Sequence, residues 1–255
     1  MKATLRIGAL ISGGGTNLQA VIDGCANHAI SGRIVFVGSD NPDAKGLERA
    51  RRHAIPSFVV DYGAILDRYR QDPRAQALPA DFDIDDIRAK CRLLPAGTNA
   101  GRIRQFLETR AIAEAALIEA MQPYPFDLLI LAGFMRNLTP YFIDRINRDP
   151  ALPRIMNIHP ALLPSFPGVD GYGDTYHYGC KIGGCTVHFI DYGEDSGPII
   201  GQRALAIAPG DSLETFKQKG LAEEWKLYPH CIELYAQGKL KVVPGEKRRV
   251  VAIAP

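Results

Sequence analysis

An amide and an imidazole lie two residues apart in the stretch Asn157-Ile158-His159-Pro160. The apolar residues before it predict a strand over 155–158, and alternation along a strand sends both side chains to the same side. An amide can stabilise the oxyanion of a tetrahedral intermediate, and an imidazole near the same carbon can move the proton of an amine. The pair fits acyl transfer to an amine, although a histidine beside a proline turn is as often structural.

A loop with three carboxylates, Asp191, Glu194 and Asp195, follows a strand predicted at 186–190. One of these carboxylates could hold His159 in its charged form and raise its pKa, since an opposite charge within about 4 to 6 Å favours the charged imidazole. The glycine and proline at 197–198 indicate a fixed turn. The alternative is an acidic hairpin that faces solvent, and spacing does not separate the two.

A glycine-rich loop, Ser12-Gly13-Gly14-Gly15-Thr16-Asn17, lies between the first predicted strand and the first predicted helix. Glycines let backbone N–H groups approach a ligand and a helix N-terminus favours negative charge, so phosphate is the expected ligand. The loop has neither the Lys-Ser or Lys-Thr of a Walker A loop nor the third glycine of a dinucleotide-binding motif. A plain strand-to-helix turn, capped by Thr16 or Asn17, is the alternative.

The remaining histidines and the cysteines form no recognised ligand motif. His53, His177, His188 and His230 lack metal-ligand spacing, so no metal is expected. The five cysteines lack paired spacing and indicate free thiols, and the first apolar run is too short for a signal or a membrane span, so a cytoplasmic protein is expected. A net charge of +2 gives no reason to expect nucleic acid or a membrane as a partner.

The segments that carry these residues alternate between strand and helix. Helices are expected at 17–28, 44–53 and 212–237, and strands at 4–11, 34–37, 57–60, 128–131, 155–158, 186–190 and, last, 199–207. This pattern is typical of an α/β fold with an open, mainly parallel twisted sheet and helices on both faces, Rossmann-like in layout. Such sheets bind ligands at the carboxyl ends of their strands, which is where the motifs lie.

Residues 62–108 do not fit this alternation, because they combine three prolines, an acidic cluster and several arginines. We interpret them as an insertion with some helix in a single domain over 1–240, followed by a C-terminal tail at 241–255 with an exposed basic patch. Long surface insertions cost little, so a decoration without chemical role is the simplest interpretation. A lid over the site and an oligomer contact are the alternatives.

Four motifs, in this order, resemble the phosphoribosylglycinamide formyltransferase family: Leu10 to Gln19, Gly133 to Arg136, Asn157 to Pro164, and Asp195 to Pro198. The resemblance covers most of the chain outside 62–108 and the tail. It implies the formyltransferase fold and direct transfer of a formyl group from the co-substrate 10-formyltetrahydrofolate to the amine of glycinamide ribonucleotide, in de novo purine biosynthesis. It also implies small-molecule substrates only, no metal, and a monomer or homodimer.

The resemblance assigns a role to each matching residue. Asn157 would bind the formyl oxygen, His159 would transfer the proton and Asp195 would support His159. The phosphate and sugar of the substrate would be held by Gly15, Thr16, Asn17 and Glu224. The folate would contact Met135, Arg136, Asn137, Leu138 and Asn157, with Arg110 near its glutamate tail. Asp170, Tyr172 and Gly173 stand where some relatives carry His or Arg, so the substrate side of the pocket is expected to differ in detail.

Two other functions fit part of the same pattern. Formyltetrahydrofolate deformylase shares the fold and the Asn, His and Asp set but gives the formyl group to water. It normally carries an N-terminal regulatory domain, for which a glycine loop beginning by residue 13 leaves no room. A non-catalytic folate-binding relative would keep the fold without needing Asn157, His159 and Asp195, all of which are present.

Overall fold

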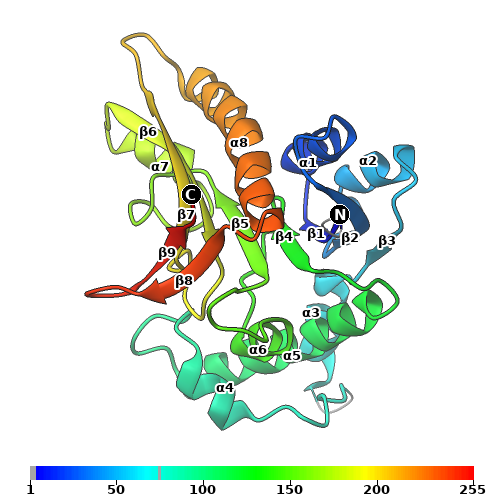
Figure 1. The fold of residues 1–255 in the computed structure, drawn as a ribbon. Coiled ribbons are helices and arrows are strands. Elements are labelled where there is room, and N and C mark those ends of the chain that lie inside the picture. Colours follow the sequence, from blue (N-terminus) through cyan, green and yellow to red (C-terminus); the bar gives the residue numbers. More distant parts are fainter. Residues whose placement is uncertain (1–3, 74–75) are drawn as a thin grey trace.

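A seven-stranded sheet runs through the computed structural model, which describes residues 4–73 and 76–255 (Figure 1). Its order is β3-β2-β1-β4-β5-β6-β7. The strands are β1 (Leu5–Ile11), β2 (Gly32–Ser39), β3 (Ser57–Val59), β4 (Leu128–Leu131), β5 (Ile155–His159), β6 (Ile182–Phe189) and β7 (Ile199–Ala206). The first five strands of this order, from β3 to β5, are parallel. β6 runs antiparallel to β5, and β7 runs antiparallel to β6. The predicted open, mainly parallel sheet is confirmed.

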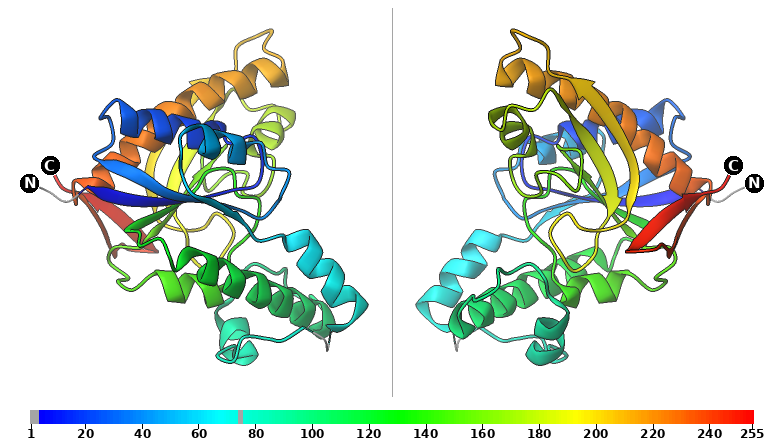
Figure 2. Two further views of the ribbon diagram at one scale, coloured as in Figure 1. Left: turned by 90° about the vertical axis from the view of Figure 1, so that its right-hand side faces the viewer. Right: turned by 90° about the vertical axis from the view of Figure 1, so that its left-hand side faces the viewer.

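Helices cover both faces of this sheet (Figure 2). One face carries α1 (Thr16–Ala26) and α8 (Leu213–Ala236), and the other carries α3 (Tyr62–Gln71), α5 (Ala100–Met121) and α6 (Pro140–Ile146). The shorter helices are α2 (Gly46–Arg52), α4 (Ile84–Lys90) and α7 (Gly171–His177). Alternation divides β1 between two apolar cores, because Ile7 and Ile11 pack with α1 and α8 while Leu10 packs with α5 and α6.

A hairpin of two further strands follows α8, although no strand was expected after 199–207. β8 (Leu240–Pro244) and β9 (Arg249–Ile253) pair antiparallel. Leu240 and Val242 are buried in the core with α8, so the expectation that β7 is the last strand is wrong. The basic residues of the tail were expected to form a plain exposed face. Arg248, however, donates hydrogen bonds of 2.6 and 2.8 Å to the carbonyls of Ser196 and Gly197. The division of the chain at residue 240 stays a prediction.

The described part of the 62–108 segment forms α3, α4 and the start of α5, and both α3 and α4 pack against α5. Asp61, Asp83 and Asn99 each accept a backbone N–H at the start of one of these helices, which explains where the helices begin. A small apolar core joins α4 and α5 to α6. The backbone N–H of Arg92 donates to the carbonyl of Tyr192 at 2.9 Å. The segment is therefore tied to the acidic loop that follows β6.

Candidate active site

A cavity of about 390 Å³ opens at the carboxyl ends of β1, β4 and β5. Its walls come from Asn17 after β1, from 133–138 after β4, and from 157–160 at the end of β5. The acidic loop after β6 lines another side, and Glu224 reaches in from α8. The predicted location of the site, at the carboxyl ends of the strands, agrees with this cavity.

His159, only 3% exposed, has an oxygen atom opposite each of its ring nitrogens. Nδ1 lies 3.2 Å from Oδ2 of Asp195, and Nε2 lies 2.8 Å from the carbonyl oxygen of Phe166. Both contacts favour the protonated ring, but burial has the larger effect and lowers the pKa of His159 below its usual range. The expectation that Asp195 leaves this pKa raised is wrong in net direction, because the ring lies out of water. The effect of the carboxylate by itself has the expected sign.

Asp195 is the carboxylate of the loop that reaches the histidine. Burial raises its pKa, but the contacts with His188 and His159 and the N–H of Gly168 together outweigh burial, so the pKa lies below the usual range. Asp195 has φ of 46° and Phe166 has φ of 54°. Both residues that face the imidazole therefore adopt a left-handed backbone, which costs non-glycine residues about 1–3 kcal/mol each. The loop lines the cavity through four of its residues, so the alternative of a purely solvent-facing hairpin does not hold.

His188 has no role in the sequence analysis, yet it lies between Asn157 and Asp195. The antiparallel register of β5 and β6 places it opposite Asn157. Its Nδ1 is 2.9 Å from the carbonyl of Phe189 and so carries a proton, while Nε2 is 3.3 Å from the amide nitrogen of Asn157 and 3.5 Å from Oδ1 of Asp195. In the tautomer without a proton on Nε2, the ring accepts an N–H of Asn157 and orients its amide. The sequence carried no short motif that could reveal this role, because the role depends on the pairing of β5 with β6.

Glu224 is buried on α8 at the opposite side of the cavity. It accepts hydrogen bonds from the amide nitrogen of Asn17 at 2.6 Å and from the hydroxyl of Tyr172 at 2.7 Å. Burial raises the pKa of Glu224 and outweighs these two hydrogen bonds, which lower it. Among the described residues Oδ1 of Asn17 is buried without a hydrogen-bond partner, so it can accept one from a ligand.

Tyr172, one of the residues that depart from the family pattern, fits closely against α8. A Cβ atom at Gly220 would come within 2.2 Å of its ring, so the glycine provides the space for the tyrosine. Asp170 accepts the N–H of Gly173 at 3.2 Å at the start of α7 and pairs with Lys217 at 3.1 Å. The departure at Tyr172 thus supplies a partner for Glu224.

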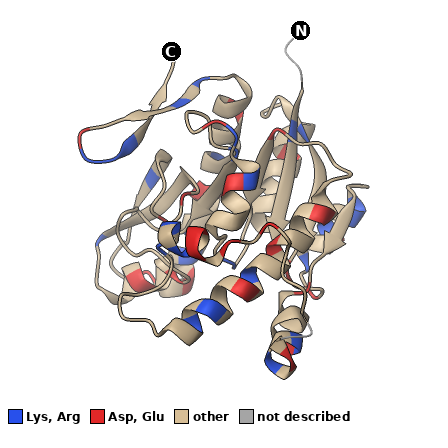
Figure 3. Cartoon of the chain, turned by 90° about the horizontal axis from the view of Figure 1, so that it is seen from below, with Lys and Arg blue, Asp and Glu red and all other residues tan. Residues whose placement is uncertain are grey.

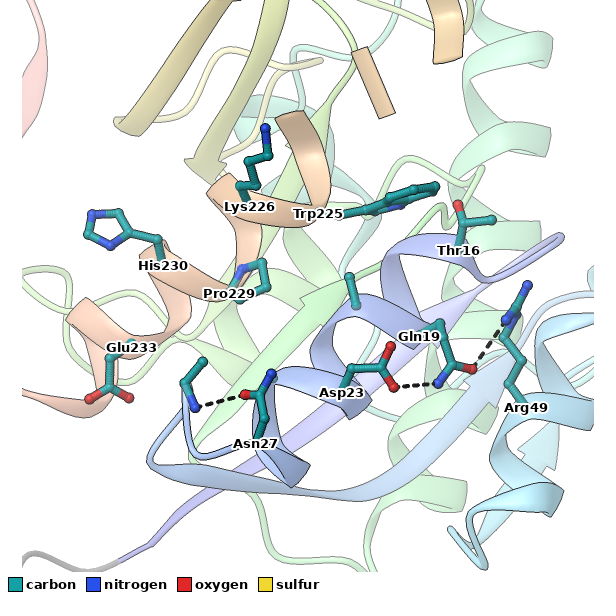
Figure 4. A pocket seen from close by; sticks show the side chains of 13 residues that line it. Thr16, Gln19, Asp23, Asn27, Arg49, Trp225, Lys226, Pro229, His230 and Glu233 are labelled. Carbon is teal, nitrogen blue, oxygen red and sulfur yellow. Dashed lines mark hydrogen bonds between the residues drawn. The ribbon is translucent and has the colours of Figure 1, made fainter. Parts of the chain in front are cut away.

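The start of α1 lies beside this cavity and beside a second one. Gly15 precedes α1 with φ of 69° and no side-chain cap, so the alternative of capping by Thr16 or Asn17 is wrong. Asn17 lines the strand-end cavity, whereas Thr16 lines a cavity of about 660 Å³ between α1 and α8 (Figure 4). In this second cavity Arg49 donates a hydrogen bond to Gln19, and Gln19 donates one to Asp23. These three polar side chains therefore bind one another.

The segment Met135, Arg136, Asn137 and Leu138 forms one wall of the strand-end cavity, as expected. The backbone N–H of Met135 donates to the hydroxyl of Ser12 at 2.7 Å, and Arg136 pairs with the buried Asp40 at 2.5 Å. Arg110 does not line this cavity but a neighbouring pocket that shares Arg136 with it. Leu93 of the 62–108 segment does line the cavity, which the sequence gave no reason to expect.

Within residues 4–73 and 76–255, no group of three or more His, Cys, Asp or Glu side chains is arranged to hold a metal ion. None of the described helices is long and apolar enough to cross a membrane. All five cysteines are free thiols.

Fold and site together define an α/β enzyme with an amide, an imidazole and a carboxylate at the ligand-binding edge of its sheet. The chain belongs to the formyl transferase family, whose profile matches residues 5–232. It is 31% identical to phosphoribosylglycinamide formyltransferase of Bacillus subtilis over 222 residues, which cover 87% of this chain and 90% of that one. Glycinamide ribonucleotide transformylase 1 from Symbiobacterium toebii has a similar solved structure, with a TM-score of 0.72, 38% identity, and coverage of 99% of this chain and 95% of that one.

A longer relative contains a similar region. The trifunctional purine biosynthetic protein adenosine-3 of Bos taurus is 29% identical over 96% of this chain, but the chain spans only 19% of the length of that protein. The comparison therefore concerns only that part of the longer protein.

Proposed function

We propose that this protein transfers a formyl group from 10-formyltetrahydrofolate to the amine of glycinamide ribonucleotide. One observation carries the proposal: a single cavity holds the amide, imidazole and carboxylate at one side and the Asn17–Glu224 pair at another. The first set suits the chemistry of acyl transfer, and the second suits a polar substrate. Membership of the formyl transferase family agrees with both.

Asn157 would stabilise the charge that develops on the formyl oxygen. Attack of the amine on the formyl carbon moves negative charge to that oxygen, and an amide N–H aimed at it is the type of donor that stabilises such a charge. His188 accepts one amide hydrogen in the geometry described above, which leaves the second for the formyl oxygen. His188 is thus a positioning residue in this mechanism.

His159 would accept the proton that the amine loses. Its lowered pKa keeps the ring neutral near pH 7, and therefore able to act as a base. Once the ring is charged, the ionised Asp195 at 3.2 Å stabilises it, as a carboxylate does in other acid–base pairs.

The ribose phosphate of the amine substrate would lie beside the N-terminus of α1, at the side of the strand-end cavity that Asn17 and Glu224 form. The N-terminus of α1, with Gly15, Thr16 and Asn17, suits the phosphate, and Glu224 suits the sugar hydroxyls. Tyr172 holds one oxygen of Glu224, and the unpartnered Oδ1 of Asn17 offers a place for a donor of the substrate.

The folate would lie along 133–138, with Asn157 at its formyl end. This wall combines the exposed, apolar Met135 with the buried Leu138, which fits an apolar, flat ring. The co-substrate supplies the formyl group, and the protein supplies orientation and proton transfer. We also propose that the protein acts on small molecules without nucleic acid or membrane, in the cytoplasm, as a monomer or homodimer.

His159→Ala tests this mechanism. We expect kcat to fall about 10²- to 10⁴-fold, the usual contribution of a general base, while circular dichroism and the melting curve remain those of a folded protein. His230→Ala is the matched control, because His230 is exposed and lines only the cavity between α1 and α8. A fully active His159→Ala enzyme would exclude His159 as the base.

A further inference from the structure

Of the described residues of the 62–108 segment, Leu93 alone lines the active-site cavity. It lies in the connection at 91–99 between α4 and α5, and it is half-buried. None of the three apolar clusters of the described residues includes Leu93, so its isobutyl group is not committed to a core. An apolar side chain in a cavity wall gains from contact with an apolar ligand. The position of Leu93 therefore gives the segment a possible part in ligand binding.

The segment is fixed to α6 close to Leu93. Lys90, the last residue of α4, pairs with Asp144 at 3.0 Å. Asp81, before α4, accepts a hydrogen bond from Tyr141 at 3.1 Å and pairs with Arg145 at 2.5 Å. Exposed ion pairs contribute little by themselves, but α4, α5 and α6 also share the small apolar core described above. The connection is thus held in place through the helix before it and the helix after it.

The connection also lies against the loop that follows β6. The backbone N–H of Arg92 donates to the carbonyl of Tyr192 at 2.9 Å, and the hydroxyl of Tyr192 donates to Asp144. Asp144 therefore holds the segment and the loop together. Leu93 is next to Arg92 in the chain, so it lies at the side of the cavity that residues 190–195 form.

This side of the cavity adjoins an apolar wall. Leu131, Leu138 and Ile190 line the cavity and pack in one apolar core. Asn17 and Glu224, which suit a polar substrate, come from α1 and α8 instead. A leucine beside such a wall suits a flat ring better than a sugar phosphate.

We propose that Leu93 packs against the fused ring of the folate and determines the affinity of the protein for this co-substrate. The inference rests on the proposed function, which places the folate along 133–138. Apolar surface that a ligand and a side chain remove from water together stabilises their complex roughly in proportion to its area. The 62–108 segment then serves as a fixed wall of the folate site and is not a decoration.

Leu93→Ala tests this proposal by calorimetric titration with 10-formyl-folate in the absence of the amine. We expect the Kd for the folate to rise about tenfold, because the variant loses most of an apolar contact with the ring. In steady-state kinetics KM for the folate should rise by a similar factor, whereas KM for glycinamide ribonucleotide should keep its wild-type value. Leu93→Met should recover most of the affinity, since methionine is apolar and has a similar volume.

Leu94→Ala is the matched control. Leu94 is the next residue, is also half-buried and does not line the cavity. The control should keep the wild-type Kd for the folate, and melting curves show whether each variant is folded. A wild-type Kd in Leu93→Ala, or an equal loss of affinity in folded Leu93→Ala and Leu94→Ala, would overturn the role of Leu93 as a ligand contact.

Turnover of the wild-type protein tests the proposed function separately. Turnover together with an unchanged folate Kd in Leu93→Ala rejects only the contact at Leu93. A raised folate Kd in Leu93→Ala, without turnover of the wild-type protein, supports the contact and rejects the reaction.

Discussion

At the scale of single residues, His159 is subject to two opposed influences. Burial disfavours the charged ring, while Asp195 and the carbonyl of Phe166 favour it. The balance keeps the ring neutral in the free protein and supplies a counter-charge at the moment of proton transfer. The chemistry therefore depends on the carboxylate even though the net pKa is lowered.

Asp195→Asn should change the pH dependence of the reaction. The lost carboxylate is an influence that raises the pKa of His159, so this pKa falls further and the ring becomes a weaker base. Activity that needs the neutral ring is lost as the pH falls through this pKa, so the acid limb of the kcat/KM profile should move to lower pH. The plateau should fall on the order of 10²-fold. An acid limb that stays in place or moves to higher pH would contradict this role of Asp195.

The residues that the sequence predicted are those whose partners follow from local spacing. Asn157 and His159 lie on one strand, and Asp195 lies in a loop whose composition marked it. The role of His188 could not be found in this way, because it depends on the register of β5 with β6. Tyr172 stood out only as a departure from the family pattern, and its hydrogen bond to Glu224 depends on the packing of α7 against α8.

At the scale of elements, the turn from β1 into α1 depends on one glycine. Gly15 combines φ of 69° with a close approach to α2, where an added Cβ would lie 2.8 Å from the Cα of Gly46. The backbone N–H of Gly46 also donates to the carbonyl of Gly13 at 2.9 Å. The two helix starts are thus packed backbone to backbone.

Gly15→Ala should lower the free energy of unfolding by about 1–3 kcal/mol, the cost of a left-handed backbone in a residue other than glycine, plus the cost of moving α2. It should also raise the KM of the amine substrate, because the proposed phosphate site includes this turn. Denaturant unfolding and steady-state kinetics measure both effects. Gly97→Ala is the control, since Gly97 has φ of 83° with nothing within 4 Å of an added Cβ, and should change stability but not KM. An unchanged KM in Gly15→Ala would place the phosphate elsewhere.

The strands of the main sheet could be predicted one by one from the sequence, because apolar runs alternate with segments whose apolar residues have helical spacing. The boundaries of β4 agree with the prediction at both ends. The hairpin of β8 and β9 was missed because basic residues between and around short apolar runs resemble an exposed tail. Its burial depends on contact with α8, which lies outside the segment itself.

At the scale of the whole molecule, Lys and Arg lie interspersed with Asp and Glu over the elements (Figure 3). The net charge is only +2, so anion binding depends on local groups and not on the charge of the whole molecule. The fold brings together residues as distant in sequence as Asn17 and Glu224, which are 207 positions apart. The early and late parts of the chain thus meet at one cavity because of the order of the strands in the sheet. Separate sequence motifs do not contain this information.

The most direct test of the central claim is the rate of formyl loss from 10-formyl-folate with and without glycinamide ribonucleotide, followed spectrophotometrically. We predict turnover only when the amine is present, with formylated amine and deformylated folate formed in equal amounts. Turnover at the same rate without the amine, with formate as product, would contradict the transferase and indicate hydrolysis of the formyl group.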